Sequence, residues 1–223
     1  MKVAVLRFPG TNCEFDTQYA FEKLGHSVDL VWHEDKNLPA DIDLVVVPGG
    51  FSYGDYLRSG SIARFSPVMK AVTAYANDGG KVLGICNGFQ ILTEAGLLPG
   101  ALKRNNNLHF ISKHQTLRVE NVDNAFLNQC EKGEVLNIPI AHADGNYYID
   151  DEGLKELEAN NQVLLRYCDK DGNDTVVNGS VTSIAGVCNR DKNVFGLMPH
   201  PERALEDILG SVDGVKMLKG FEA

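Results

Sequence analysis

Cys86 lies between Gly84 and Gly88 in the segment KVLGICNGFQIL, residues 81–92. The spacing G-x-C-x-G matches the sharp strand-to-helix turn that exposes a nucleophile, with cysteine in place of serine. Such a turn is tight, so its near neighbours must lack side chains. The positive end of the following helix would favour the thiolate, and the backbone N–H of Asn87 would point toward a developing oxyanion. The alternative interpretation is a buried cysteine beside a tight turn.

His200 ends a different apolar run, and Pro199 and Pro201 fix the backbone on both sides of it. If the segment is extended, His200 and Glu202 project to the same side. A carboxylate beside an imidazole orients the ring and stabilises its protonated form. Together with Cys86, the pair could form the set of nucleophile, base and orienting group. Taken singly, the histidine could be structural and the glutamate a helix-start carboxylate.

Gly49 and Gly50 end the apolar run that begins at Leu44. Bare backbone at this point can approach a ligand closely. The N–H groups near Gly50 and Phe51 could complete an oxyanion hole opposite Asn87, and losing one such donor typically costs roughly 10²- to 10³-fold in rate. An ordinary Gly-Gly turn is the alternative.

The elements that must position these groups follow a β-α-β rhythm in the first half of the chain. Apolar runs predict strands at residues 2–7, 27–32, 43–47 and 81–85, and helical segments at 13–24, at 62–76 and after Gly88. The apolar face predicted for the second helix consists of Ile62, Phe65, Met69, Val72 and Ala76. Continuous apolar runs are typical of parallel strands that are covered by helices on both faces.

The pattern changes after residue 102. Strands divided by polar turns are predicted within 115–122, 133–145, 162–168 and 180–189, several of them antiparallel, with little helix except around 154–160. The segment 193–210 predicts a strand, a turn and a short helix. No linker or repeat divides the chain, so we expect residues 1–223 to form a single α/β domain. We expect a three-layer open sheet, flavodoxin-like, parallel in the first half and mixed with antiparallel strands in the second, with helices on both faces.

Composition narrows the classes of function. Lys and Arg total 21 against 30 for Asp and Glu, a formal charge of −9, which disfavours a nucleic-acid groove or an anionic membrane contact. We find neither a signal-peptide core nor an apolar window of membrane-spanning length, so we expect a soluble, cytoplasmic protein. The five cysteines are widely spaced without a C-x-x-C pair, which indicates reduced thiols and no metal site. No phosphate-binding loop is present, so any ATP chemistry should belong to another chain.

Taken in order, the segments PGG, GICNGFQIL and PHPE resemble those of class I (triad) glutamine amidotransferases, in which a cysteine attacks the side-chain amide of glutamine and ammonia leaves. A narrower resemblance extends over nearly the whole chain and is to glutaminase subunits of phosphoribosylformylglycinamidine synthase, which act in purine synthesis. The segments that carry it are RFPGTNCEFD, PGGFSYGDYLRSG, LPGALKRN, IPIAHADGNYY and MPHPERA.

The resemblance implies that Cys86 is the nucleophile, His200 the base that activates it, and Glu202 the group that holds the base. The positions that it implies around the glutamine are Gln90, Asp55 and Leu57. For His142 and Asp144 the family has a similar stretch, and both a structural turn and a site remain open.

The resemblance also implies partners. L-glutamine would be the substrate, and no metal or organic cofactor would be needed in this chain. A separate synthetase subunit, using ATP and magnesium, would convert formylglycinamide ribonucleotide to formylglycinamidine ribonucleotide with the ammonia. A small third subunit would join the two.

Two other classes of protein share parts of this pattern. The first is an elbow-cysteine hydrolase or chaperone-like redox protein of similar α/β shape, but there the histidine usually follows the cysteine closely, whereas His200 lies far downstream. The second is a catalytically silent scaffold, which the intact His-Pro-Glu sequence disfavours. The spacing therefore favours an amidotransferase.

Overall fold

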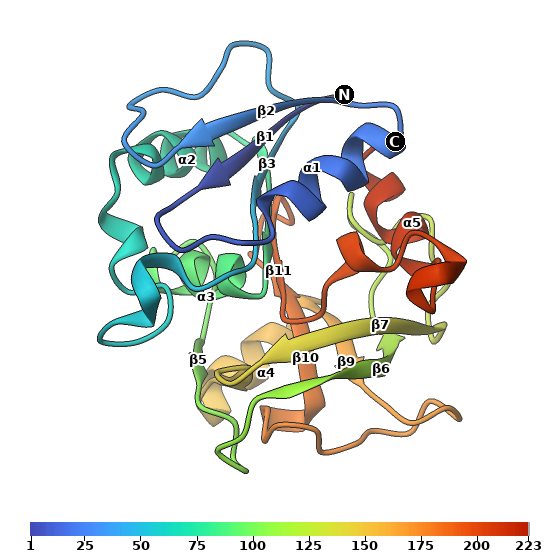
Figure 1. Cartoon of the computed structure of the whole chain (residues 1–223). Helices are drawn as coiled ribbons and strands as arrows, with labels where there is room; N and C mark the ends of the chain where they lie inside the picture. Colours follow the sequence, from blue (N-terminus) through green and yellow to red (C-terminus); the bar gives the residue numbers. More distant parts are fainter. Residues whose placement is uncertain (223) are drawn as a thin grey trace.

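The computed structural model describes residues 1–222 and contains a nine-stranded sheet with the strand order β2-β1-β3-β4-β11-β10-β9-β6-β7 (Figure 1). A separate pair, β5-β8, forms a two-stranded sheet. The strands are β1 (Lys2–Arg7), β2 (Ser27–Trp32), β3 (Leu44–Val47), β4 (Lys81–Ile85), β5 (Ala101–Lys103), β6 (Ile111–Val119), β7 (Val135–His142), β8 (Asn146–Tyr148), β9 (Val163–Tyr167), β10 (Ile184–Cys188) and β11 (Val194–Leu197). The α-helices are α1 (Glu14–Lys23), α2 (Pro67–Asn77), α3 (Asn87–Glu94), α4 (Asp151–Ala159) and α5 (Asp213–Lys219). Short 3-10 helices are η1 (Ser52–Asp55), η2 (Ala63–Phe65), η3 (Val181–Ser183), η4 (Pro201–Arg203), η5 (Asp207–Leu209) and η6 (Gly220–Glu222).

The first half of the chain forms four of the parallel strands of the sheet, as predicted, and β11 from near the end of the chain is the fifth. Strands β2, β1, β3, β4 and β11 run parallel to one another. From β1 the chain crosses to β2 on one side, whereas from β3 it crosses to β4 on the other. Because such crossovers are right-handed, α1 lies on one face of the sheet and α2 on the opposite face. All side chains of β3 are buried, which explains its uninterrupted apolar sequence.

The second half of the chain adds antiparallel strands to the same sheet, and this prediction is also confirmed. Strand β10 pairs antiparallel with both β11 and β9, and β6 pairs antiparallel with both β9 and β7. The alternating burial of β7 fits a strand with one covered face. The small sheet of β5 and β8 was not predicted, because strands of three residues carry little periodic signal.

Two predicted helices differ in the structure. The segment 62–76 is not one helix: η2 ends at Phe65, Ser66 is extended, and α2 begins at Pro67. Proline favours the first helical position and forces the residue before it out of the helical region, so the break has a local cause. Phe65, predicted on the apolar face, is 72% exposed.

The short helix predicted near the end of segment 193–210 is also wrong. The structure has only the 3-10 turns η4 and η5 there, and η5 ends at Gly210 in the left-handed conformation. The α-helix of this region is α5, which begins later, at Asp213. Its seven residues were too few for a helical pattern to be recognised.

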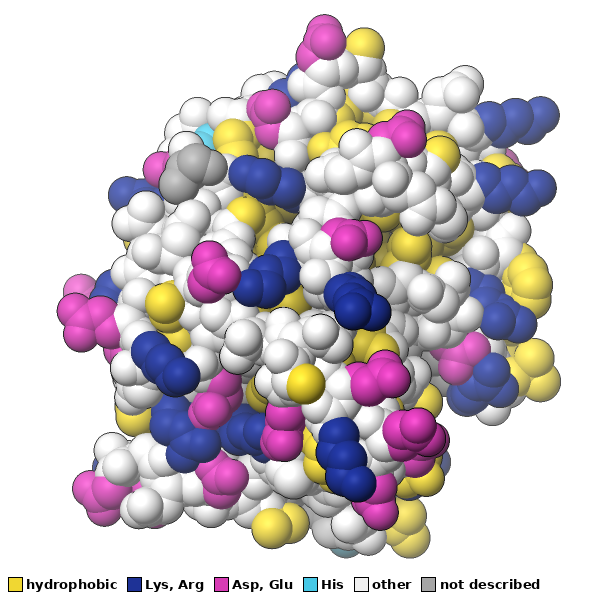
Figure 2. Space-filling view, turned by 180° about the vertical axis from the view of Figure 1, so that it is seen from behind, with side chains coloured by type: hydrophobic (Ala, Val, Ile, Leu, Met, Phe, Trp, Pro, Cys, Tyr) yellow, Lys and Arg dark blue, Asp and Glu magenta, His cyan; other side chains and the backbone are white. Residues whose placement is uncertain are grey.

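The surface carries charges of both signs, and the thiols are reduced. Figure 2 shows acidic and basic side chains interspersed over the back of the molecule. No helix within residues 1–222 is long and apolar enough to cross a bilayer. All five cysteines, each of them in the described part, are free and buried.

Candidate active site

The corner at Cys86 joins β4 to α3, and its backbone is strained. Cys86 has φ 51° and ψ −105°, a conformation that side chains with a Cβ rarely adopt. Its N–H donates to the carbonyl of Leu197 in β11 at 2.8 Å, and its own carbonyl accepts from the N–H of Gln90 at 3.2 Å. The corner is therefore fixed by one bond across the sheet and one within the helix.

Both glycines of the G-x-C-x-G pattern are required by packing. A Cβ on Gly84 would lie 2.6 Å from Cδ1 of Leu92 in the next helix. A Cβ on Gly88 would overlap the carbonyl oxygen of Val47 at the end of β3. The sequence-based requirement for bare backbone here is confirmed, and it is what allows α3 to pack closely on the sheet.

His200 and Glu202 reach the same edge of the sheet as Cys86. Strands β4 and β11 are parallel neighbours in which Ile85 pairs with Leu197, so the residues that follow both strands leave at one edge. Nδ1 of His200 donates to Oε1 of Glu202 at 2.6 Å, as the two-residue spacing predicted. Both side chains are buried, and Nε2 of His200 has no hydrogen-bond partner.

The surroundings of His200 favour its protonated form. Burial alone would oppose the charge, but the carboxylate of Glu202 and the thiols of Cys86 and Cys13 outweigh it, so the pKa of the imidazole is raised well above its usual value. A high imidazole pKa beside a thiol favours transfer of the thiol proton to the ring. The three predicted catalytic side chains are thus brought together with the electrostatics that an attacking thiolate needs.

The two sides of the predicted oxyanion hole differ. Asn87 is the first residue of α3, where the N–H has no acceptor within the helix. On the other side, Gly50 has φ 140° and packs against the backbone of Thr11 and Asn12, an approach that only glycine permits. The N–H of Phe51 donates to the carbonyl of Gly10 at 3.0 Å, so it is not free to bind an oxyanion as expected. The N–H of Gly50 therefore remains the candidate donor on this side of the oxyanion hole.

Two cavities meet at Cys86. One, of about 150 Å³, is lined by both Cys86 and His200, together with Cys13 and Arg203. The other, of about 30 Å³, lies toward the substrate side predicted from the sequence. Its lining includes the predicted residues Gly50, Phe51, Asp55 and Gln90, and also Ser59, His142 and Asp144.

Asp55 and Asp144 place two carboxylates in the smaller cavity. The hydroxyl of Ser59 donates to Oδ2 of Asp144 at 2.8 Å and also interacts with Asp55. Burial, together with the charge of Asp144, raises the pKa of Asp55 to about 6, although the Ser59 contact opposes the shift. Such a pair of carboxylates can receive a cationic group.

Gln90 and Leu57 were both predicted to border the glutamine. The amide of Gln90 accepts from Nδ2 of Asn87 at 2.8 Å and donates to the carbonyl of Asp144 at 2.7 Å, so it ties α3 to the loop after β7. Leu57 is 91% exposed and does not line the cavity, so the structure does not bring it to the site.

Four residues near the site were left open or missed. Of the two left open, Asp144 lines the smaller cavity and accepts from Ser59. His142, left open, lines the cavity, and burial followed by the charge of His200 lowers its pKa to about 4, so it is neutral. Ser59 was missed because an isolated serine in a loop carries no spacing signal. Cys13 was not predicted at the site, yet its thiol lies beside His200 and accepts from Nη2 of Arg203 at 3.1 Å.

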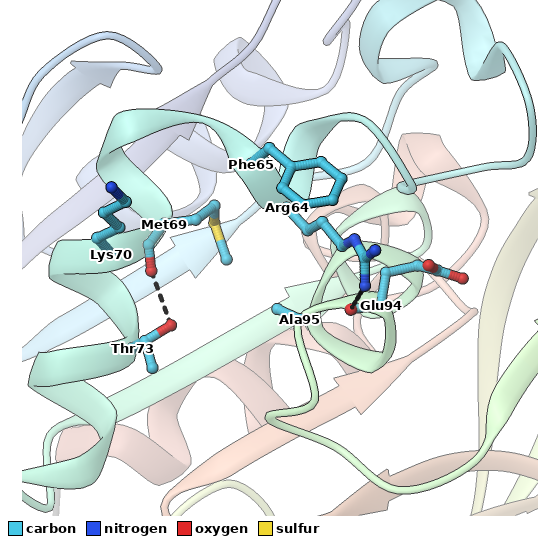
Figure 3. A pocket seen from close by; sticks show the side chains of 7 residues that line it. All are labelled: Arg64, Phe65, Met69, Lys70, Thr73, Glu94 and Ala95. Atoms are coloured by element: carbon cyan, nitrogen blue, oxygen red, sulfur yellow. Dashed lines mark hydrogen bonds between the residues drawn. The ribbon is translucent and has the colours of Figure 1, made fainter.

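A further cavity, of about 410 Å³, lies between η2, α2 and the end of α3, and none of the predicted site residues lines it (Figure 3). Two of its polar side chains are bonded locally: Arg64 donates to the carbonyl of Glu94, and the Thr73 hydroxyl donates to that of Met69. None of the predicted catalytic side chains reaches this cavity, so the candidate active site is the one at Cys86.

The known proteins that this chain resembles in sequence and fold are glutamine amidotransferases. The model of the family described as "CobB/CobQ-like glutamine amidotransferase domain" matches residues 1–216. The chain belongs to this family. A relative from Sulfurimonas denitrificans, named phosphoribosylformylglycinamidine synthase subunit PurQ, is 69% identical over 221 residues, 99% of each chain. One of the same name from Campylobacter jejuni is 60% identical over 221 residues, 99% of this chain and 96% of its own.

Solved structures agree with the assignment to this amidotransferase family. A chain of the structure of PurLQS from Thermotoga maritima has a TM-score of 0.89 and 44% identity, covering 99% of this chain and 97% of its own. A glutamine amidotransferase from the same organism has a TM-score of 0.60 at 16% identity, covering 100% of this chain and 90% of its own, which shows a shared fold alone. The alternative of an elbow-cysteine hydrolase or redox chaperone finds no support.

Proposed function

We propose that this chain is the glutaminase subunit of a phosphoribosylformylglycinamidine synthase, releasing ammonia from L-glutamine for a synthetase partner. The observation that carries the proposal is the buried His200–Glu202 pair, joined at 2.6 Å. The pair follows β11, the parallel neighbour of the strand β4 that leads into Cys86. Full-length relatives at 60% to 69% identity bear the name of that subunit and support it.

The reaction begins with the thiolate of Cys86. It attacks the side-chain amide carbon of glutamine, and the developing oxyanion accepts from the backbone N–H groups of Asn87 and Gly50. His200, having taken the thiol proton, gives a proton to the departing ammonia, while Glu202 keeps the ring oriented. A γ-glutamyl thioester remains on Cys86. Water, deprotonated by His200, then attacks the thioester and releases glutamate.

The substrate's α-amino end fits the acidic side of the smaller cavity. Asp55 and Asp144 supply carboxylates there, and the interior of the cavity is bounded by Gln90 and the loop after β7. A free amino acid carries an ammonium group, which these carboxylates can pair with. We therefore assign Asp55 to recognition of the α-ammonium group, with Gln90 holding the loop that carries Asp144.

Ammonia needs a protected route to its acceptor. In bulk water near neutral pH it becomes ammonium, which is not a nucleophile, so the subunit must dock against its synthetase. That partner would use ATP and magnesium to aminate formylglycinamide ribonucleotide, and a small third subunit would join them; the solved structure of PurLQS from Thermotoga maritima fits such an assembly. The proposed half-reaction requires no metal or organic cofactor in this chain. A single domain, a cytoplasmic location and the absence of nucleic-acid binding stay predictions.

A diazoketone analogue of glutamine tests the nucleophile directly. We expect one equivalent to label Cys86, located by peptide mass spectrometry, and glutamate release by the complex to stop in proportion. Cys86→Ala should prevent both labelling and glutamate release without unfolding the chain, whereas Cys188→Ala, at a buried cysteine of β10, should leave both intact. Normal glutamate release by Cys86→Ala would refute the assignment.

A further inference from the structure

Cys13 brings a second thiol to the catalytic histidine from a distant part of the sequence. It follows β1, at the same edge of the sheet as the residues after β4 and β11, and only 2% of it is exposed. Its Sγ and ligand atoms of His200 and Glu202 all lie within 4.8 Å of one another. The catalytic scheme uses the histidine and the glutamate but gives Cys13 no task.

Two atoms of this cluster lack partners although they are buried. Nε2 of His200 and Oε2 of Glu202 have no hydrogen-bond partner, and the two side chains are 1% and 2% exposed. Nε2 serves Cys86 in catalysis, so Oε2 of Glu202 is the buried atom that still calls for an explanation, and a bound ion would give it a partner. The cavity of about 150 Å³, which is lined by Cys13, His200 and Cys86, provides a path for such an ion.

We propose that Cys13, His200 and Glu202 form an inhibitory binding site for a thiophilic divalent cation, of which Zn²⁺ is the type. A thiolate, an imidazole and a carboxylate are a ligand set for zinc or cobalt and not for magnesium or calcium. Zinc bonds of about 2.0–2.3 Å place tetrahedral ligands roughly 3.3–3.8 Å apart. The ligand atoms farthest apart must approach by at most about 1.5 Å, and the 2.6 Å contact between His200 and Glu202 must widen. Cys86, on the wall of the same cavity, or water would complete the coordination.

The neighbours of Cys13 permit this role. Its thiol donates to Oδ1 of Asn12 and accepts from Nη2 of Arg203, each at 3.1 Å. Burial raises the pKa of the Cys13 thiol, and His200 and the Arg203 guanidinium only partly oppose that rise. The charge of Arg203 is balanced by Asp16 at 2.9 Å, which limits its repulsion of a cation. Gly49 leaves the necessary space, since a Cβ there would lie 3.1 Å from Sγ of Cys13 and 2.9 Å from Cε1 of His200.

The consequence for catalysis is direct. A cation shared by His200 and Glu202 must replace the proton that joins Nδ1 to Oε1, so the ring loses the bond that orients it and glutamine hydrolysis stops while the ion is bound. A cysteine binds a metal ion as the thiolate, so binding of the ion must displace the proton of the Cys13 thiol. The inhibition rests on the proposed catalytic role of His200, whereas binding of the ion itself depends on the three side chains alone.

Cobalt titration of the purified chain tests the proposal without an activity assay. We expect one Co²⁺ per chain, with the thiolate-to-cobalt charge-transfer band and the strong visible absorption of tetrahedral cobalt, and displacement by Zn²⁺. Cys13→Ser should weaken binding by at least about tenfold and remove thiolate intensity, whereas Cys188→Ser, at a buried cysteine in β10, should bind as the wild type does.

Wild-type protein provides a second measurement if Cys13→Ser does not fold. Bound Zn²⁺ should protect Cys13 from alkylation by iodoacetamide, as read by peptide mass spectrometry. The proposal is overturned if the wild type shows no thiolate band. It is equally overturned if the band survives Cys13→Ser and disappears in Cys86→Ser, which would place the metal on the nucleophile alone.

Discussion

Gly49→Ala tests whether the placement of His200 sets the rate. The backbone of Gly49 is not in the left-handed region, so alanine is tolerated there and the added methyl group acts only through contact. It would lie 2.9 Å from Cε1 of His200, and the buried ring must withdraw by about half an ångström to restore the ordinary contact distance of 3.4 Å. Since misplacement of a reacting group by about 1 Å can cost about 10²-fold, we expect kcat to fall about ten- to a hundredfold.

The assay is glutamate release by the assembled complex, with thermal unfolding measured in parallel. The control is Gly25→Ala, where nothing lies near the added methyl group but φ is 87°, so it should lose about 1–2 kcal/mol of stability with kcat unchanged. Gly49→Ala should instead lose rate in excess of its loss of stability. A wild-type kcat in Gly49→Ala would refute the argument that the position of the imidazole limits the chemistry.

The other predictions concern charge and strain. Glu202→Gln removes the carboxylate that sustains the high pKa of His200, so that pKa should fall, and kcat should drop by at least about 10²-fold in a pH–rate profile. For Asp55, whose pKa is about 6, KM for glutamine should rise as the pH falls through that value; Asp55→Asn, which tolerates the positive φ, should have a high KM at every pH. Cys86→Gly should be more stable toward urea than Cys86→Ala by about 0.5–1 kcal/mol, because glycine adopts the strained corner freely; equal midpoints would contradict this.

The parts of the fold predicted from the sequence are those with strong periodic signals. Strand β3 reads as a fully apolar run because helices cover both faces of the sheet, and β7 alternates because one of its faces is open. The break at Pro67 was missed although proline signals it, since the apolar residues before and after it share one spacing. The helix α5 and the strands β5 and β8 are too short for a pattern to rise above the background.

The candidate site was predictable where spacing carries chemistry. The elbow glycines and the two-residue step from His200 to Glu202 fix local geometry, so the sequence alone indicates them. Cys13 and Ser59 reach the site only through the tertiary fold. Neither has a diagnostic neighbour in sequence, and only the order of the parallel strands brings the residue after β1 to the histidine after β11.

The strain at Cys86 explains why so many separate features meet at one corner. The strained backbone conformation of Cys86 costs about 1–3 kcal/mol of free energy. Such a conformation persists only where several contacts with the surroundings hold it in place. The bond to Leu197 supplies one constraint, and the close approach of Gly88 to Val47 supplies another, because either would be lost if the corner relaxed. Both constraints come from the neighbouring strands β11 and β3, and the segments that directly follow these strands carry the histidine and the oxyanion glycine. The same central strands of the sheet therefore hold Cys86 in its strained conformation and align it with His200 and Gly50.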